Sequence, residues 1–149
     1  MRLVLALAAA SLWVAATPAP VLAAPADAAA VAQPTCGDFL VRMKKKPAHL
    51  AFEGCKALPD AQGKPLRATY RVPGRYAAGA EAYFVKAFGM ERLKRSCCQW
   101  DAPARQFKDA RGREYSIRMV SGETTRASRA AWPRIPAFEV TVETFTEEI

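Results

Sequence analysis

Cys97-Cys98-Gln99-Trp100 is the stretch that organises this chain, because it sets two of the four cysteines side by side. The other two, Cys36 and Cys55, lie far upstream. A Cys97–Cys98 bridge would close a small strained ring, and adjacent residues on an extended strand point to opposite faces. We therefore expect two long-range disulfides, in which Cys36 and Cys55 each pair with one member of the adjacent pair. The sequence leaves open which of them takes which partner.

The cysteine spacing indicates a structural role. An even number of cysteines in an exported domain implies disulfides. A redox site would need Cys-X-X-Cys beside a helix start, and a four-thiolate zinc site would need paired spacings such as Cys-X2-Cys. The chain has neither pattern. We expect no metal and no cofactor.

Residues 1–23 have the features of an export signal. Arg2 provides a positive start, Leu3–Ala16 is apolar apart from one serine, and small or apolar residues precede Ala23. We predict cleavage after Ala23, with Ala28 as the alternative, and a periplasmic or secreted protein. No later run approaches the ~20 apolar residues of a membrane span, so we expect no transmembrane segment.

The rest of the chain has the length of one domain. Residues 24–34 are rich in Ala and Pro without an amphipathic period, which predicts a disordered leader before a single domain at 35–149. The chain has 22 basic and 14 acidic side chains, and losing Arg2 leaves 21 minus 14, or +7. This charge favours acidic partners, such as an anionic glycan, a lipid head group or an acidic protein. Export argues against nucleic acid, as does the lack of a basic run with interleaved aromatics.

Hydrophobic periodicity predicts an α+β fold. The clearest strand is Leu66–Val72, where apolar residues alternate with Arg67, Thr69 and Arg71, so that one face is buried and the other cationic. Runs of strands joined by short turns favour an antiparallel sheet of about five strands, with two helices packed on one face, in the order α-β-β-α-β-β-β. Thr35 is the predicted cap of the first helix, whose last turn would hold Lys44–Lys46, where cations complement the dipole, and the second helix is predicted at about 75–88. Three or four strands follow it. The predicted strands are 49–56, with a bulge at Gly54, then 66–72, 93–100, one near 107, 114–120 and 138–143.

The sequence gives little support to a catalytic function. The single histidine, His49, begins a predicted strand and has no candidate nucleophile beside it. A Ser-His system with Ser121 lacks the Gly-X-Ser-X-Gly elbow, and pairing Glu123 with Asp101 for glycoside hydrolysis rests on no pattern. We therefore expect a protein that is not an enzyme.

Two stretches are candidates for binding. The polar loop Ser121–Arg126 follows a firm strand, as exposed recognition loops do. The arginine face of the Leu66–Val72 strand is the second. The candidate binding residues are Arg67, Arg71, Ser121, Glu123, Thr124 and Arg126. Trp100 and Trp132 fit the core better than an interface.

Several short motifs resemble a family of small exported proteobacterial proteins of unknown function, over roughly residues 36–149. The resemblance implies the architecture and brings no activity. The motifs are Lys46-Pro47, Leu50–Cys55, Phe88-Gly89-Met90, Cys97–Trp100, Tyr115-Ser116-Ile117 and Met119–Thr124.

Together these features predict an exported, non-catalytic binding protein that acts on another protein, as an inhibitor or immunity protein does. In size, export and disulfides alone, the chain is similar to periplasmic immunity proteins and to inhibitors of cell-wall or lipid hydrolases. The alternatives are a basic envelope module that binds anionic glycan or lipid, and a small hydrolase.

Overall fold

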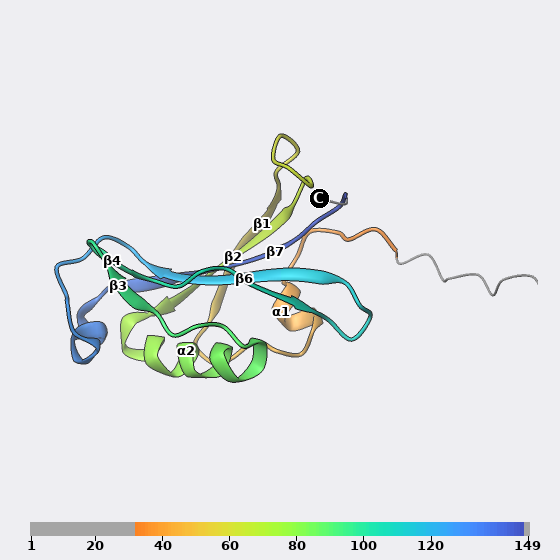
Figure 1. Cartoon of the computed structure of the whole chain (residues 1–149). Helices are drawn as coiled ribbons and strands as arrows, with labels where there is room; N and C mark the ends of the chain where they lie inside the picture. The colour runs from red at the N-terminus through yellow and green to blue at the C-terminus, as the bar shows by residue number, and fades with distance from the viewer. Residues whose placement is uncertain (1–31, 148–149) are drawn as a thin grey trace, which may run out of the picture. The chain divides into compact units, whose positions relative to one another are not determined.

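The computed structural model describes residues 32–147, which form one antiparallel sheet with helices on one of its faces (Figure 1). The predicted signal peptide, 1–23, and most of the segment 24–34 lie outside the described residues. None of the helices within 32–147 has the length and apolar character that crossing a bilayer requires.

The sheet has seven strands, in the order β1-β2-β7-β6-β4-β3, with β5 paired to β6 outside this path. The antiparallel sheet is confirmed, but the prediction of about five strands is wrong. Residues 93–108 form three short strands where the sequence pattern predicts two. The strands are β1 (Ala51–Ala57), β2 (Leu66–Pro73), β3 (Lys94–Ser96), β4 (Gln99–Asp101), β5 (Arg105–Lys108), β6 (Glu114–Ser121) and β7 (Ala137–Thr144).

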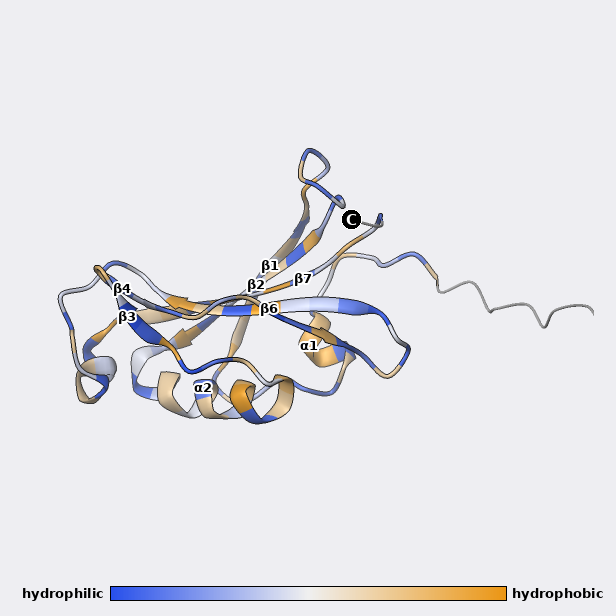
Figure 2. Ribbon diagram, in the orientation of Figure 1, coloured by the Kyte–Doolittle hydropathy of each residue, from blue (hydrophilic) through white to orange (hydrophobic). Residues whose placement is uncertain are grey.

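The three central strands, β2, β7 and β6, supply one wall of the core. Ala68 lies opposite Val142, and Val142 lies opposite Ile117, so the apolar residues of all three strands share a face. The alternation that the sequence predicts for β2 and β7 is confirmed by their burial. Figure 2 shows hydrophobic and hydrophilic residues alternating along the β1–β2 hairpin. The predicted bulge at Gly54 is also present, as a register shift between Phe52 and Gly54.

Helix α2 (Gly74–Phe88) covers this apolar face, as the sequence predicts. It ends at Gly89, whose φ of 71° is the left-handed conformation of a helix C-cap. At its other end, Gly74 packs so closely on the 3-10 helix η1 (Arg129–Arg134) and the residue after it that a Cβ would collide with two carbonyl oxygens. The buried residues of α2 recur at helical spacing: Ala77, Ala80, Glu81, Phe84 and Phe88.

Helix α1 (Phe39–Arg42) is shorter than the sequence pattern predicts. The predicted cap is Thr35, but Asp38 is the N-cap: its Oδ1 accepts a hydrogen bond of 3.0 Å from the Val41 N–H. The lysines at 44–46 follow the helix, so they do not complement its dipole as predicted. Gly37, whose φ is 155°, is not in a helical conformation, so the helix does not extend back toward residue 35.

Asp38 also joins α1 to the sheet. The Tyr70 hydroxyl donates to Asp38 Oδ1 at 3.1 Å and accepts from the Leu40 N–H at 3.1 Å. Burial alone would raise the pKa of Asp38, but hydrogen bonds from Lys46, Val41 N–H and Tyr70 outweigh it and lower the pKa. Burial raises the pKa of Tyr70, which keeps its hydroxyl protonated and able to donate.

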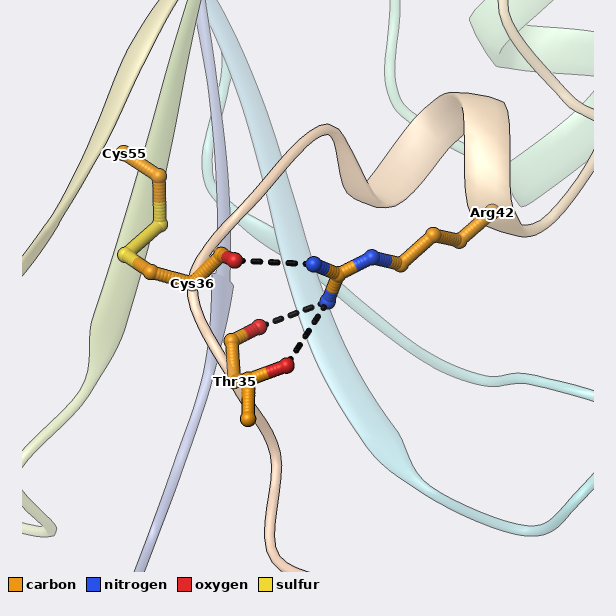
Figure 3. Close-up of a disulfide and its surroundings, with 4 residues drawn as sticks. All are labelled: Thr35, Cys36, Arg42 and Cys55. Carbon is orange, nitrogen blue, oxygen red and sulfur yellow. Dashed lines mark hydrogen bonds between the residues drawn. A yellow bond between two sulfur atoms is a disulfide. The ribbon is translucent and has the colours of Figure 1, made fainter.

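A disulfide joins Cys36 to Cys55 of β1, with a Cα–Cα distance of 5.5 Å (Figure 3). The Arg42 guanidinium braces it from the α1 side by donating to the carbonyl oxygens of Thr35 at 2.6 Å and Cys36 at 2.8 Å. The two predicted long-range bridges to Cys97 and Cys98 are therefore wrong, since both of those cysteines are free thiols.

Sheet topology explains why those bridges do not form. Cys55 lies on β1 at one edge of the sheet, whereas Cys97 and Cys98 form the turn between β3 and β4 at the other. From β1 to β4 there are four strand spacings, or roughly 19 Å, and a disulfide needs Cα atoms within about 7 Å. Residues 93–100, predicted as one strand, turn back at Cys97, whose φ is 49°.

Candidate functional site

The face of the sheet turned away from the helices carries polar side chains. In the part of the chain that the structure describes, α1 and α2 both lie on the opposite side (Figure 1). We call this surface the open face. Its residues form three rows across β2, β7 and β6: Arg67, Glu143 and Ser116; Thr69, Thr141 and Arg118; and Arg71, Glu139 and Val120.

Each arginine of the open face is paired with a carboxylate. Arg67 binds Glu143 of β7, Arg71 binds Glu53 of β1, and Arg118 lies 3.3 Å from Asp101 of β4. The candidate binding residues Arg67 and Arg71 therefore lie on the exposed side of β2, as predicted, but their charges are matched by neighbours. The surface presents ordered planar guanidinium groups with little net positive field.

Smaller side chains lie between these arginines. Thr69, Thr141 and Val120 are half-buried, and Ser116 is buried although it belongs to the same face. Thr69 and Thr141 thus stand in the middle row, between rows that carry the longer ion-paired side chains. Such a surface can accept side chains from a partner.

Ser121 lies in the core. It is the last residue of β6 and stands opposite Phe138 on the inward-facing side, with 2% of its surface exposed. Its Oγ accepts from the Trp100 N–H at 2.8 Å and donates to the Gly122 carbonyl oxygen at 2.7 Å. The strand runs one residue past its predicted end, so alternation places the Ser121 side chain on the inward face. Its hydroxyl therefore joins β6 to β4 and is not exposed to a partner.

The remainder of the predicted loop, 122–126, is anchored to the β3–β4 hairpin and points its side chains outward. The Thr124 N–H donates to the Cys98 carbonyl oxygen at 2.6 Å. The Arg126 carbonyl oxygen accepts from the Trp100 indole N–H at 2.8 Å. Glu123 and Arg126 are exposed and Thr124 is half-buried. This loop therefore holds two charged side chains on a fixed backbone, beside the β3–β4 hairpin at the end of β6.

The two thiols lie beside this loop. Cys97 is exposed and Cys98 half-buried, and the Cys97 thiol donates to the sulfur of Cys98 at 2.9 Å. The pKa of Cys98 is raised, first by its hydrogen bond with Cys97, then by burial and by the negative charges of Cys97 and Glu123. Activated nucleophilic cysteines have a lowered pKa, so Cys98 lacks that signature.

An ion pair between the buried Glu81 and the partly exposed Arg129, which the sequence analysis missed, supports the same end of the sheet. The Arg129 guanidinium binds Glu81 of α2 through two hydrogen bonds of 2.6 and 2.9 Å, and donates to the Leu93 carbonyl oxygen at 2.6 Å. It also lies 4.6 Å from the ring centroid of Trp132 and 5.6 Å from that of Trp100. The available signal is Glu81 itself, which falls on the inward stripe of α2 and therefore needs a cationic partner.

Three of the residues considered for catalysis, His49, Ser121 and Asp101, have other partners. The ring of His49 stacks on Tyr76, with centroids 3.7 Å apart, and the Ser121 hydroxyl is committed to β4 and Gly122. Asp101 binds Arg118 and Gln99. Among residues 32–147, no group of three or more His, Cys, Asp or Glu side chains could hold a metal ion.

Comparison with known proteins identifies the family and no more. No curated protein and no solved structure is detectably similar to the chain. Residues 26–100 match the model of a domain of unknown function, DUF4952, and this match includes β1, β2, α2 and the Cys97–Trp100 stretch. Because the match spans half of the 149 residues, the chain belongs to the DUF4952 family.

Proposed function

We propose that this chain is an exported, non-catalytic periplasmic binding protein that recognises another protein, as an inhibitor or immunity protein does. The observation that carries this proposal is the open face, where ion-paired arginines lie beside small residues on the side of the sheet that no described helix covers. The Cys36–Cys55 disulfide supports an oxidising compartment, where such bridges persist.

The chemistry of the open face favours a protein partner. Arginine is enriched in protein–protein interfaces, where its planar guanidinium both hydrogen-bonds and stacks. Arg71 and Arg118 are about half exposed, and each is held in place by a carboxylate. Binding of a partner therefore costs less side-chain conformational entropy at these two residues. The exposed Glu123 and Arg126, in the loop that follows β6, add one charge of each sign near this end of the sheet. A partner with mixed charge fits it better than a uniformly anionic polymer.

The proposal is tested by capture with matched charge reversals. The chain, expressed as residues 1–149, is immobilised and exposed to envelope extracts of its source and of competing bacteria. Bound proteins are then identified by mass spectrometry. Arg71→Glu should reduce the captured partner by ~tenfold or more, as changes at interface hot spots do. Lys86→Glu is the control, because it makes the same charge change on an exposed position of α2. Circular dichroism verifies that both variants are folded.

Equal capture by both variants would refute the open face as the contact surface. The alternative of a basic module for anionic glycan or lipid rests on the net charge of +8. That function predicts binding that falls steeply with added salt and responds equally to Arg71→Glu and Lys86→Glu. The hydrolase alternative predicts a turnover that His49→Ala or Glu123→Gln abolishes in a folded protein.

A further inference from the structure

The adjacent cysteines occupy the tightest turn in the described part of the sheet. Ser96 pairs with Gln99, which leaves Cys97 and Cys98 as the two central residues of the β3–β4 hairpin. Their sulfur atoms are 2.9 Å apart. Ordinary non-bonded contacts between heavy atoms lie near ~3.5–4.0 Å, and a disulfide bond near ~2.05 Å. The turn thus holds the two thiols closer than packing alone would.

The backbone of Cys97 gives an independent sign that its side chain has a role. Its φ of 49° lies in the left-handed region, which costs a residue with a Cβ roughly 1–2 kcal/mol. Two-residue hairpin turns favour Gly at such positions. A turn that needed only this backbone conformation would be more stable with Gly. The Cys97 thiol makes a hydrogen bond to the sulfur of Cys98.

The fold limits what these thiols can pair with. The chain does form a disulfide, Cys36–Cys55, at the opposite edge of the sheet and out of reach. Adjacent Cα atoms are ~3.8 Å apart, below the ~4.4–6.8 Å of ordinary disulfides, so a bridge between neighbours is strained and easily reduced. Strained, exposed disulfides are the labile ones. The Cys36–Cys55 disulfide at one edge of the sheet therefore suits a structural role, and a Cys97–Cys98 disulfide at the other edge would suit a reversible one.

We propose that Cys97 and Cys98 form a reversible redox site, a dithiol that closes into a vicinal disulfide by exchange with a small-molecule disulfide such as oxidised glutathione. One cysteine thiolate attacks the small disulfide and releases one small thiol. The second cysteine attacks the resulting mixed disulfide and releases the other. Two cysteine thiols thus become one disulfide, and the small disulfide takes up the two electrons and two protons as two thiols.

Closure of this ring acts directly on the candidate binding loop. The carbonyl oxygen of Cys98 accepts the Thr124 N–H at 2.6 Å, so a change in the Cys97–Cys98 peptide moves the acceptor that fixes loop 122–126. The raised pKa of Cys98 keeps that thiol protonated near neutral pH, which suits slow equilibration with the surroundings better than rapid catalysis. The redox site does not depend on the proposed binding function.

The first test is redox titration with peptide mapping. The chain is equilibrated in buffers with graded ratios of reduced to oxidised glutathione, quenched in acid, alkylated and digested with trypsin. Cleavage after Arg95 and Arg105 yields one peptide that contains Cys97 and Cys98 and neither Cys36 nor Cys55. Over intermediate ratios this peptide should lose two hydrogens and escape alkylation, and it should reopen at ratios where Cys36–Cys55 is still linked.

Three results would overturn the proposal. The peptide is alkylated twice at every ratio that preserves Cys36–Cys55, it accumulates glutathione without closing, or it is found linked to the Cys36 or Cys55 peptide.

The dithiol form has its own probe, phenylarsine oxide, which loses its oxygen as water and forms two As–S bonds. One arsenical should bind per chain with Cys36–Cys55 intact, and both Cys97→Ser and Cys98→Ser should abolish this. Binding that survives either substitution contradicts a paired site.

Discussion

Arg129→Met is expected to destabilise the domain by about 3 kcal/mol, the low end of the cost of breaking a buried pair, because it leaves the buried Glu81 carboxylate unpaired while Arg129 itself is 39% exposed. The Glu81 side chain is 4% exposed and would keep one hydrogen bond, from the Leu93 N–H at 2.6 Å. It would lose the two from Arg129, and the Leu93 carbonyl oxygen would lose its donor. Methionine retains an apolar stem against Trp100 and Trp132, so the change isolates the charge.

The matched control is Arg118→Met on the open face. Arg118 and Asp101 are 45% and 25% exposed, and exposed pairs contribute at most about 1 kcal/mol. The double variant Glu81→Met/Arg129→Met should be more stable than Arg129→Met alone, because no buried carboxylate is left unpaired.

Urea denaturation of the oxidised protein, followed by circular dichroism, measures all four proteins. Arg129→Met should lower the urea midpoint at unchanged slope, several times more than Arg118→Met. If Arg129→Met costs less than about 1 kcal/mol, or if the double variant is the least stable, Glu81 is not a buried charge dependent on Arg129 and the reasoning fails.

Three further changes address the helix contacts. Gly74→Ala should cost about 1–3 kcal/mol by forcing a Cβ into η1, measured by urea midpoint; an unchanged midpoint would contradict the close packing. Tyr70→Phe should cost about 1–3 kcal/mol by leaving the Leu40 N–H without an acceptor, and hydrogen exchange at that amide should accelerate. The lowered pKa of Asp38 means that its ionised form adds stability above the ordinary pKa of 3.8, and this is lost as pH falls through the folded-state value. The stability difference from Asp38→Asn should therefore shrink upon acidification, and a constant difference from pH 7 to pH 2 would refute it.

The parts of the fold set by local periodicity could be predicted from sequence. In β2, strict alternation of apolar and polar residues identifies a strand and its buried face, and in α2 the spacing of Ala77, Phe84 and Phe88 identifies the inward stripe. The C-cap at Gly89 follows from the permissive backbone of glycine. Each of these signals lies within a few residues of the feature it predicts.

The cysteines show what local signals cannot provide. Their pairing depends on strand order, and β3 lies at the edge opposite β1 because β7, the last strand, inserts between β2 and β6. No pattern near Cys97 contains that information. Adjacent cysteines point to opposite faces only within a strand, whereas Cys97 and Cys98 form the turn between β3 and β4. Sequence reasoning therefore predicted that cysteines hold the fold together but assigned the wrong partners.

The same division applies to the candidate binding surface. The exposure of Arg67 and Arg71 follows from alternation along β2, but their carboxylate partners come from β7 and β1, which only the sheet register brings alongside. The polarity of Ser121 favours a loop position when the sequence is considered alone. Its inward position is instead compatible with burial because the Trp100 N–H and the Gly122 carbonyl oxygen satisfy its hydroxyl.

Arginine–carboxylate pairs thus occur in two settings in this chain, and physical chemistry gives them different consequences. In the Arg129–Glu81 pair the carboxylate is only 4% exposed, although Arg129 itself is 39% exposed, so losing Arg129 should weaken the whole domain. The pairs of Arg71 and Arg118 are exposed and should contribute little to stability. What they do contribute is order, since a guanidinium held in place loses less entropy when a partner binds. Substitutions on the open face should therefore change binding at constant stability, whereas those at Arg129 should change both together.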